Sequence, residues 1–304
     1  MASDDLYSEM GDILAAVAHR IDVSTDDADL ILLHSNAIFA LPRAGLVIRV
    51  ATNPHALERV ATSLRITRWL AERGFPCVAP AAVEGQPWVE RGRVVSVWRH
   101  LSLVEKPTPT GSELGHVLAL LHEQPTPPDP PEQLSDPLDS VSQALHGRSH
   151  NLSAADSAWL ADRIDRLRTK WRTLEFPRPS GLVHGDAHPG NLMRTSSGRV
   201  VLGDWDHVAI GPPEWDLVQV HYTRRRFGYP SDQEIEDMSR VYGWDLRDWP
   251  DGMAVLLAIR EVTGLSPYLR NAHVKPFLAT ELVHRVDTLR RNDTTARWNR
   301  PPNE

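Results

Sequence analysis

The segment from residue 181 to residue 206 interrupts a C-terminal half that otherwise has the spacing of helices. Its two parts, GLVHGDAHPGNLM (181–193) and RVVLGDWD (199–206), each contain a short β-like run, and the intervening TSSG is a turn sequence. A hairpin folds back on itself, so Asp204 at the end of its second arm is expected to return close to Asn191. The segment therefore predicts a small sheet with polar residues gathered at one end.

Three polar residues of this segment form a set with distinct chemistry. Asp186 is expected on a loop between short strands, five residues before Asn191. The amide of Asn191 and the carboxylate of Asp204 offer hard oxygen ligands, which suit Mg²⁺ bridging phosphates. Asp186 then remains available to accept a proton from a hydroxyl. Kinases divide the labour of phosphoryl transfer in this way, so the pattern points to that reaction.

Two other interpretations of the segment remain open on the residues alone. His184, Asp186 and His188 have an alternating spacing that zinc or manganese could accept. Together with Asp204 they would form a metal-dependent hydrolase, although that interpretation leaves Asn191 without a role. The second alternative is a polar loop in which His184 and Asp186 only cap turns, and it does not account for a returning Asp204.

The composition restricts the partners of the chain. Its 304 residues include 33 Lys and Arg against 40 Asp and Glu, a net charge of −7, whereas nucleic-acid binding needs a positive field. No apolar run approaches the ~20 residues that span a bilayer, and the acidic N-terminus lacks the layout of a secretory signal. Cys77 is the only cysteine, which excludes an internal disulfide and a multi-cysteine zinc site. We therefore expect a cytoplasmic protein that binds neither nucleic acid nor membrane.

The periodicity of apolar residues divides the chain in two. Residues 1–99 have the pattern of a small α+β unit with strand pairs at 29–51 and 88–98, and the remainder is mostly helical. Helical patterns cover residues 6–21, 54–73, 138–146, 153–175, 213–227, 231–242, 249–271 and 275–291. The polar tail after Asn292 is expected to be frayed.

HGDAHPGN followed by GDWD resembles the signatures of the aminoglycoside phosphotransferase and choline-kinase-like superfamily of small-molecule kinases. Weaker pieces follow the same order, including RWLAERGFP (68–76) and GPPEWDL (211–217). The resemblance implies an α+β, two-lobed protein-kinase-like fold. Its small β-rich, nucleotide-binding N-lobe would be residues 1–99, and its larger, mainly helical C-lobe, with the connector, catalytic loop and acceptor site, would be residues 100–304.

The resemblance also implies roles for single residues of the two motifs. Asp186 would be the catalytic aspartate, with Asn191 and Asp204 as metal ligands. His184 would steady the backbone of the Asp186 loop. Asp216 would begin a helix and tie the same loop down.

The nucleotide site is expected in the first lobe. Ser35 and Asn36 precede an aromatic residue as in the family's nucleotide loop, and the base would bond to the connector backbone near Arg99 and Leu101. The family's third-strand lysine is absent, because the strand LVIRVA places Arg49 there. Arginine is always charged and binds phosphate bidentately, so it can take over this role with altered geometry.

The partner of Arg49 stays open. Aligning RWLAERG places Ser63 near the family's usual glutamate position, while Glu58 lies more than a turn earlier. Either Arg49 binds phosphate with Glu58 or a water as its partner, or the nucleotide site is weakened.

Taken together, the residues and the resemblance predict a kinase that uses ATP or GTP with Mg²⁺ to phosphorylate a hydroxyl of a small molecule. An aminoglycoside or another antibiotic is one candidate acceptor. The alternative is a nucleotide-binding, kinase-like protein with weak or no catalysis. The sequence leaves the acceptor and the oligomeric state open.

Overall fold

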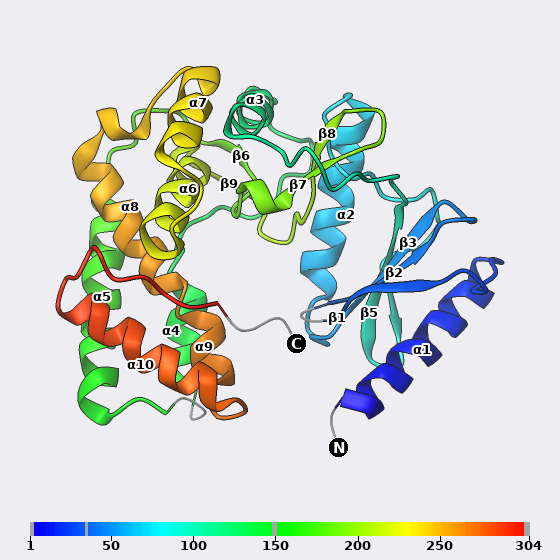
Figure 1. Ribbon diagram of the computed structural model, residues 1–304, viewed down its shortest axis with the longest axis horizontal. Helices are drawn as coiled ribbons and strands as arrows, with labels where there is room; N and C mark the ends of the chain where they lie inside the picture. Colours follow the sequence, from blue (N-terminus) through cyan, green and yellow to red (C-terminus); the bar gives the residue numbers. More distant parts are fainter. Residues whose placement is uncertain (1–2, 34–35, 148–150, 301–304) are drawn as a thin grey trace. The chain divides into compact units, whose positions relative to one another are not determined.

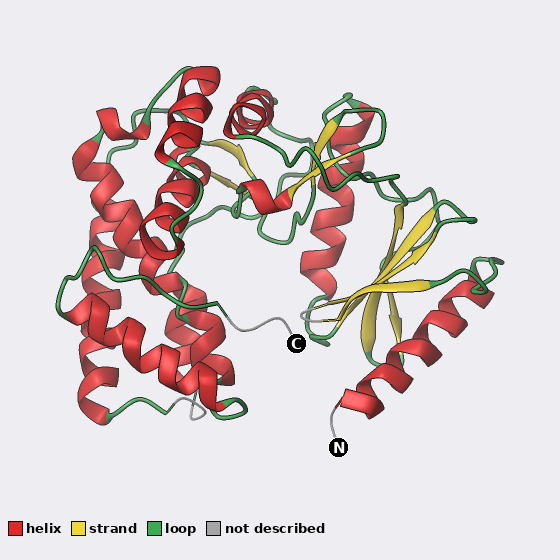
Figure 2. Ribbon diagram, viewed as in Figure 1, coloured by secondary structure: helices red, strands yellow, loops and turns green. Residues whose placement is uncertain are grey.

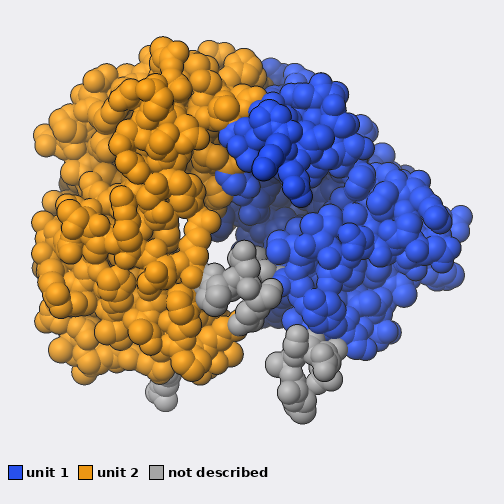
Figure 3. Space-filling model, in the orientation of Figure 1, with its two compact units in different colours: residues 1–109, 126–131, 190–208 blue, residues 110–125, 132–189, 209–304 orange. Residues whose placement is uncertain are grey.

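The computed structural model describes residues 3–33, 36–147 and 151–300, and its fold is α+β (Figures 1 and 2). The chain forms two compact units, coloured separately in Figure 3. Unit 1 comprises residues 1–109, 126–131 and 190–208; unit 2 comprises residues 110–125, 132–189 and 209–304. The lobe boundary after residue 99 stays a prediction, and by its packing the segment 100–109 groups with unit 1.

Unit 1 contains a five-stranded antiparallel sheet with the strand order β1-β2-β3-β5-β4. The strands are β1 (Asp29–Leu33), β2 (Asn36–Leu41), β3 (Leu46–Ala51), β4 (Trp88–Glu90) and β5 (Arg93–Arg99). Arg91 and Gly92 connect β4 to β5 with φ values of 49° and 78°, a region that glycine enters readily. The strand pair expected at 88–98 is present, whereas the region 29–51, expected to form one strand pair, contains the three strands β1, β2 and β3.

The two faces of this sheet pack against different helices. Met10, Ile13 and Val17 of α1 (Ser3–Arg20) form one core with Ile48 and Val50 of β3. On the other face lies α2 (Leu57–Glu72), and its core contains Ala51, Val60, Leu64, Val94 and Trp98. Successive side chains of a strand point to opposite faces. Arg49 lies between Ile48 and Val50, so it points toward the face that α2 covers.

A short hairpin completes unit 1. Its arms are β7 (Leu192–Arg194) and β8 (Val200–Leu202), paired antiparallel as the sequence predicts. Backbone hydrogen bonds join β8 to the segment that follows α2, from Val78 N to Leu202 O (3.1 Å) and from Leu202 N to Pro76 O (2.9 Å). Cys77 in that segment is buried, and burial raises its pKa to about 12, which keeps the thiol protonated.

Unit 2 is mainly helical, with one short strand pair, β6 (Gly181–Val183) and β9 (Ala209–Gly211). Its helices are α3 (Gly111–His122), α4 (Asp139–His146), α5 (Ala154–Thr173), α6 (Glu214–Phe227), α7 (Asp232–Tyr242), α8 (Pro250–Thr263), α9 (Ser266–Asn271) and α10 (Pro276–Arg290). Short 3₁₀ turns occur at Pro189–Asn191, where the chain passes between units, and at Leu246–Asp248. Across the described ranges, no helix combines the length and the apolar character that a bilayer span requires.

Three details differ from the sequence predictions. The helix expected over 249–271 is divided into α8 and α9 near Gly264, where the Tyr222 hydroxyl would lie 2.3 Å from any added Cβ. The helix expected from Pro54 begins at Leu57, because a turn from Asn53 O to Ala56 N precedes it. The tail expected to fray is fixed as far as Asn299, whose backbone N donates to Glu281 (2.8 Å).

Candidate active site

The loop that carries Asp186 follows β6 directly and belongs to unit 2. Its backbone is held by Asp216, a fully buried residue in the first turn of α6. The two carboxylate oxygens of Asp216 accept hydrogen bonds from the backbone N of His184 and of Gly185, both at 2.8 Å. Gly185 has a φ of 86°, where a side chain would be strained. These contacts confirm that Asp216 ties the loop to a helix.

Asp216 is kept ionised in this buried position. Burial works to raise its pKa, whereas the hydrogen bond and charge of His122 and the nearby His184 lower it, and the net shift is downward. His122 Nε2 lies 3.1 Å from the carboxylate. An ionised acceptor makes stronger hydrogen bonds to backbone N–H groups than a neutral one, so the loop is anchored by a charge.

The side chain of Asp186 remains accessible while its backbone is fixed. His184 is buried, and its Nδ1 accepts from the backbone N of Asp186 at 3.3 Å, as expected for a residue that steadies the loop. Gln219 of α6 donates from Nε2 to one Asp186 oxygen at 2.6 Å. The other oxygen lies 3.8 Å from His188 Nε2, and 32% of the Asp186 side chain is exposed. The carboxylate is thus oriented by Gln219 and still reachable by a ligand.

Asn191 and Asp204 are brought together in unit 1 by the β7–β8 hairpin. The backbone N of Gly203 donates to Asn191 O at 2.9 Å, so the second arm returns to the start of the first. Asp204 follows with a φ of 55°, a left-handed conformation that is uncommon outside glycine. Such backbone conformations are concentrated at functional sites.

The oxygen atoms of these two residues fit a hard divalent cation. Asp204 is exposed, and within the described part of the chain its carboxylate takes part in no hydrogen bond or ion pair. Carboxylate and amide oxygens are the donors that Mg²⁺ accepts. Among the described residues, no group of three or more His, Cys, Asp or Glu side chains is arranged to hold a metal ion. The buried His184, moreover, directs Nδ1 to the loop backbone.

Arg49 forms an ion pair that no motif of the sequence predicts. Its partner is Asp206, two residues after Asp204, and only 10% and 11% of the two side chains are exposed. Arg59 of α2 lies 3.6 Å from the same carboxylate oxygen. Burial works to raise the pKa of Asp206, but the charges of Arg49 and Arg59 and the hydrogen bond from Arg49 outweigh it and lower the pKa. Asp206 is therefore a carboxylate shared by two arginines.

This pairing corrects the expectation that Arg49 uses Glu58 or a water. Glu58 is exposed in the first turn of α2, and Ser63 is fully buried. Arg49 and Asp206 are 157 residues apart, and no local pattern connects them. The one available signal was the second aspartate of GDWD, which stands two residues after the predicted metal ligand.

The remaining predicted nucleotide residues belong to unit 1. Asn36 begins β2 and pairs in register with Ala51, and Ile38 pairs with Arg49, so Asn36 and Arg49 share one face of the sheet. Ser35 lies outside the described residues. The backbone N of Arg99 already donates to Ala79 O at 3.0 Å, so that amide is not available to a base.

Structural comparison places the fold among small-molecule kinases. The amicoumacin kinase hAmiN, solved with AMP-PNP, Ca²⁺ and Ami, matches with a TM-score of 0.68 and 12% identity over 91% of both chains. Choline kinase LicA from Streptococcus pneumoniae matches with a TM-score of 0.63 and 13% identity over 92% of this chain and 99% of its own. The aminoglycoside phosphotransferase APH(2")-IIia, solved with GDP and kanamycin, matches with a TM-score of 0.64 and 15% identity over 90% of this chain and 95% of its own. At these identities the likeness describes the fold.

The family itself is indicated by a sequence model. The model of the phosphotransferase enzyme family, APH, matches residues 34–254, which include β3 with Arg49, both motifs and Asp216. This is the superfamily that the motifs resemble. The chain belongs to the phosphotransferase enzyme family.

Proposed function

We propose that this protein is a kinase that transfers the γ-phosphoryl group of ATP or GTP to a hydroxyl of a small molecule. The observation that carries the proposal is the Asp186 loop. Its backbone is anchored by the buried, ionised Asp216, and the Asp186 carboxylate is oriented by Gln219 on a side chain that is 32% exposed. Such a carboxylate can accept the proton of a hydroxyl and hold that hydroxyl in line for attack.

Asn191 and Asp204 are proposed as the ligands of a divalent cation, Mg²⁺. The hairpin that closes through Gly203 N and Asn191 O supports their joint use. The cation would neutralise phosphate charge when bound. The remaining work of the chain is positioning, because phosphoryl transfer needs charge neutralisation and alignment more than covalent chemistry.

Arg49 is proposed to bind the nucleotide phosphates in place of the family's lysine, with Asp206 as the carboxylate that orients it. The ion pair is buried, so the guanidinium has a defined direction. Asp206 also keeps Arg59 nearby, which leaves two positive charges against one negative. This excess suits a polyphosphate. In this proposal the carboxylate that orients Arg49 is Asp206, which lies on the same loop as Asp204 and not on helix α2.

Asn36 is proposed to contact the nucleotide from the sheet face that it shares with Arg49. Ser35 is proposed as a further nucleotide contact on the sequence motif alone. The connector is proposed to bind the base. With the amide of Arg99 already bonded to Ala79, Leu101 is the better candidate for a donor. Because relatives are solved with AMP-PNP and with GDP, both nucleotides belong in the first assay.

Proteins of similar fold include a phosphotransferase solved with kanamycin, a spectinomycin phosphotransferase and a choline kinase, so the first acceptors to test are aminoglycosides, other antibiotics and amino alcohols. Purified protein is incubated with Mg²⁺ and either ATP or GTP against such a panel, and phosphorylated product is detected by mass spectrometry. The proposal predicts product with at least one hydroxyl compound and none without nucleotide. Nucleotide-dependent thermal stabilisation without product from any acceptor would instead indicate a binding protein. Tightly bound zinc or manganese without a nucleotide effect would indicate a hydrolase.

A further inference from the structure

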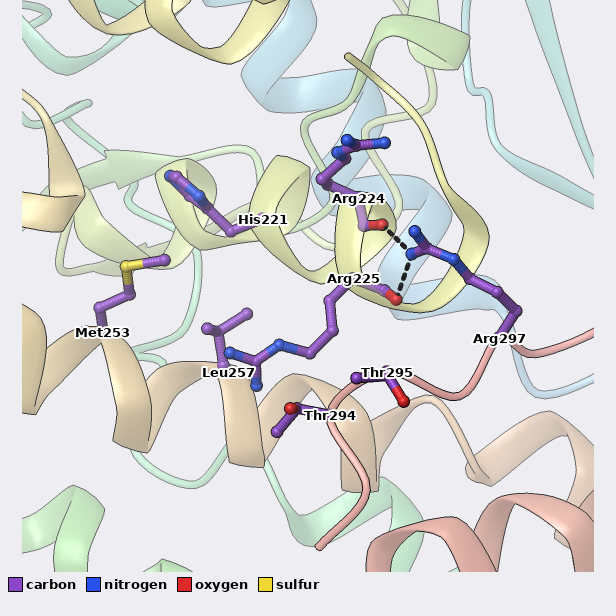
Figure 4. Close-up of a pocket in the computed structure, with 8 residues that line it drawn as sticks. All are labelled: His221, Arg224, Arg225, Met253, Leu257, Thr294, Thr295 and Arg297. Carbon is purple, nitrogen blue, oxygen red and sulfur yellow. Dashed lines mark hydrogen bonds between the residues drawn. The ribbon is translucent and has the colours of Figure 1, made fainter. Parts of the chain in front are cut away.

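A buried arginine, Arg260, lies in the last turn of α8 and has no part in the phosphoryl-transfer chemistry proposed above. Only 7% of the residue is exposed. Met253 and Leu257 of the same helix line a pocket together with residues of α6 (Figure 4), and Arg260 follows Leu257 at helical spacing on that side of α8. Its side chain is therefore directed toward α6.

Trp215, in the first turn of α6, holds the guanidinium group of Arg260. Nη2 of Arg260 donates to the backbone O of Trp215 at 2.7 Å, and Cζ lies 3.7 Å from the centre of the Trp215 ring. A cation over a tryptophan ring is attracted to it, and more strongly when both are shielded from water. Trp215 precedes Asp216 and lies one turn before Gln219, which contacts Asp186. Arg260 is thus fixed beside the part of α6 that supports the Asp186 loop.

The positive charge of Arg260 is not neutralised at close range. In residues 3–33, 36–147 and 151–300 no carboxylate lies at ion-pair distance from it, and its Nε is buried without a hydrogen bond. Burial lowers the pKa of Arg260 to about 10, and the charge of Asp186 opposes this most strongly, followed by Asp216 and Tyr222. The group is therefore charged at neutral pH, and the proposed proton acceptor is its strongest electrostatic partner.

A cation at this position suits the chemistry expected of Asp186. Asp186 and Asp216 bring two carboxylates to one loop, and like charges disfavour each other. An arginine bound directly to Asp186 would cover an oxygen that the acceptor hydroxyl needs. The neutral amide of Gln219 contacts one Asp186 oxygen instead, at 2.6 Å. An arginine held on Trp215 can offset the repulsion without covering the other oxygen.

We propose that Arg260 is a positioning residue of the kinase site, whose buried charge offsets the repulsion between Asp186 and Asp216 and so holds the proton-accepting carboxylate in place. This role rests on the proposed function, because it takes Asp186 as the residue that accepts the hydroxyl proton. The buried guanidinium group acts through Asp186 and does not itself contact a substrate. The competing explanation is an arginine that only packs on Trp215.

A double-mutant cycle between residues 260 and 186 tests the charge interaction. Asp186→Asn removes the negative charge and keeps the size of the side chain, and Arg260→Gln removes the positive charge and keeps a donor for Trp215 O. Urea unfolding of the full chain at neutral pH gives the folding equilibrium constant of all four proteins. Asp186→Asn is expected to reduce this constant about threefold or more further in the wild type than in Arg260→Gln, because only the wild type loses an attraction.

Two further substitutions of Arg260 separate charge from packing. Arg260→Lys keeps the positive charge but lacks the planar group that lies over Trp215, so Asp186→Asn should have nearly its wild-type effect in this background. Arg260→Met keeps apolar contact with the ring and should behave as Arg260→Gln does. Asp232→Asn is the matched control, because this carboxylate of unit 2 is 69% exposed and pairs with Arg224. Its effect should be the same with and without Arg260.

Three results would overturn the proposal and leave Arg260 as a packing residue. The first is an equal effect of Asp186→Asn in the wild type and in the charge-removing variants. The second is an Arg260→Lys background that behaves as Arg260→Met does. The third is failure of both Arg260→Gln and Arg260→Met to fold; if only one of them folds, that variant carries the cycle. The cycle needs neither nucleotide nor acceptor, so its outcome is distinct from that of the turnover assay that tests the proposed kinase function.

Discussion

Arg49 occupies a strand position at which a lysine was expected, and it meets its acid on the loop that carries the proposed metal ligand. The buried ion pair with Asp206 joins the sheet to the segment Asp204–Trp205–Asp206. Trp205 is itself 1% exposed and donates from Nε1 to Leu202 O at 3.0 Å, so the loop has little freedom. At the scale of the residue, the proposed phosphate contact, Arg49, and the proposed metal ligand, Asp204, are therefore linked through one short segment.

A double-mutant cycle tests this coupling. Asp206→Asn is expected to lower the free energy of unfolding by on the order of 2–4 kcal/mol, because it leaves Arg49 buried without its counter-charge. Arg49→Gln is also expected to lower the free energy of unfolding, because it leaves Asp206 buried without its counter-charge. The double variant should lose less than the sum, with a coupling of about 1 kcal/mol or more in urea unfolding. If the effects of the two single substitutions on the free energy of unfolding simply add, the ion pair does not stabilise the fold.

The same pair predicts a dependence on pH. The pKa of Asp206 is lowered in the folded protein, so its stabilisation is present above the unfolded value of about 3.9 and is lost as the pH falls through the folded value. The difference in unfolding free energy between the wild type and Asp206→Asn should be constant near pH 7 and shrink below about pH 4. Urea titrations at successive pH values measure it. If the difference in unfolding free energy between the wild type and Asp206→Asn stays the same at low pH, the stabilisation does not come from the ionised carboxylate of Asp206.

At the scale of the element, α3 and α7 approach each other through glycine. Thr110 and Glu113 form a capping box at the start of α3, and the helix then presents Gly111 and Gly115 to α7. An added Cβ would lie 2.0 Å from Glu234 O at Gly111 and 2.4 Å from Met238 O at Gly115. Since α3 carries His122, which contacts Asp216, this close packing also supports the anchor of the Asp186 loop.

Gly115→Ala and Gly11→Ala form a matched pair of helix substitutions. Gly115→Ala is expected to lower the unfolding free energy by about 1–3 kcal/mol or more, because the backbones must separate. Gly11 in α1 has no neighbouring atom within 4 Å of an added Cβ. Gly11→Ala is therefore expected to raise stability by about 0.5–1 kcal/mol through helix propensity. Chemical denaturation measures the free energy of unfolding of both variants. Equal changes in the two variants would contradict the close contact between α3 and α7.

The elements show where sequence reasoning succeeds and where it ends. The return of the chain from Asp204 to Asn191 was predictable, because hairpins are local and the turn TSSG marks one. The strand β9 was missed, since it is short and its partner β6 lies on the far side of the whole β7–β8 hairpin, with Leu182 opposite Ile210. The Arg49–Asp206 pair was missed for the same reason, because partners distant in sequence leave no periodic signal.

At the scale of the whole molecule, the family match spans residues 34–254, while the two units are interleaved along the chain. Unit 1 takes the hairpin 190–208 from between β6 and β9 of unit 2. A fragment ending at residue 99 would therefore lack Asn191, Asp204 and Asp206. The functional unit is the whole chain, and nucleotide binding should be measured on it.

Nucleotide is expected to stabilise the whole protein. With Mg²⁺ and a concentration near 100 times its dissociation constant, ADP should add about 2.7 kcal/mol to the free energy of unfolding, an increase of several degrees in Tm. Arg49→Gln should reduce this shift, and Glu58→Gln, at an exposed position, should not. Differential scanning calorimetry measures all three proteins. A shift that is equal in Arg49→Gln and wild type would contradict the proposed phosphate contact.

The most direct test of the central claim is the turnover of Asp186→Ala and Asp204→Ala with the acceptor found in the panel. Asp186→Ala should lower kcat by about 10²–10⁴ as expected for loss of a general base, while the Tm shift with ADP is retained. Asp204→Ala should also lower turnover, through loss of a cation ligand. Glu58→Gln is the matched control and should turn over normally. Unchanged phosphoryl transfer in both aspartate variants would contradict the assignment of this chain as a kinase that works through Asp186.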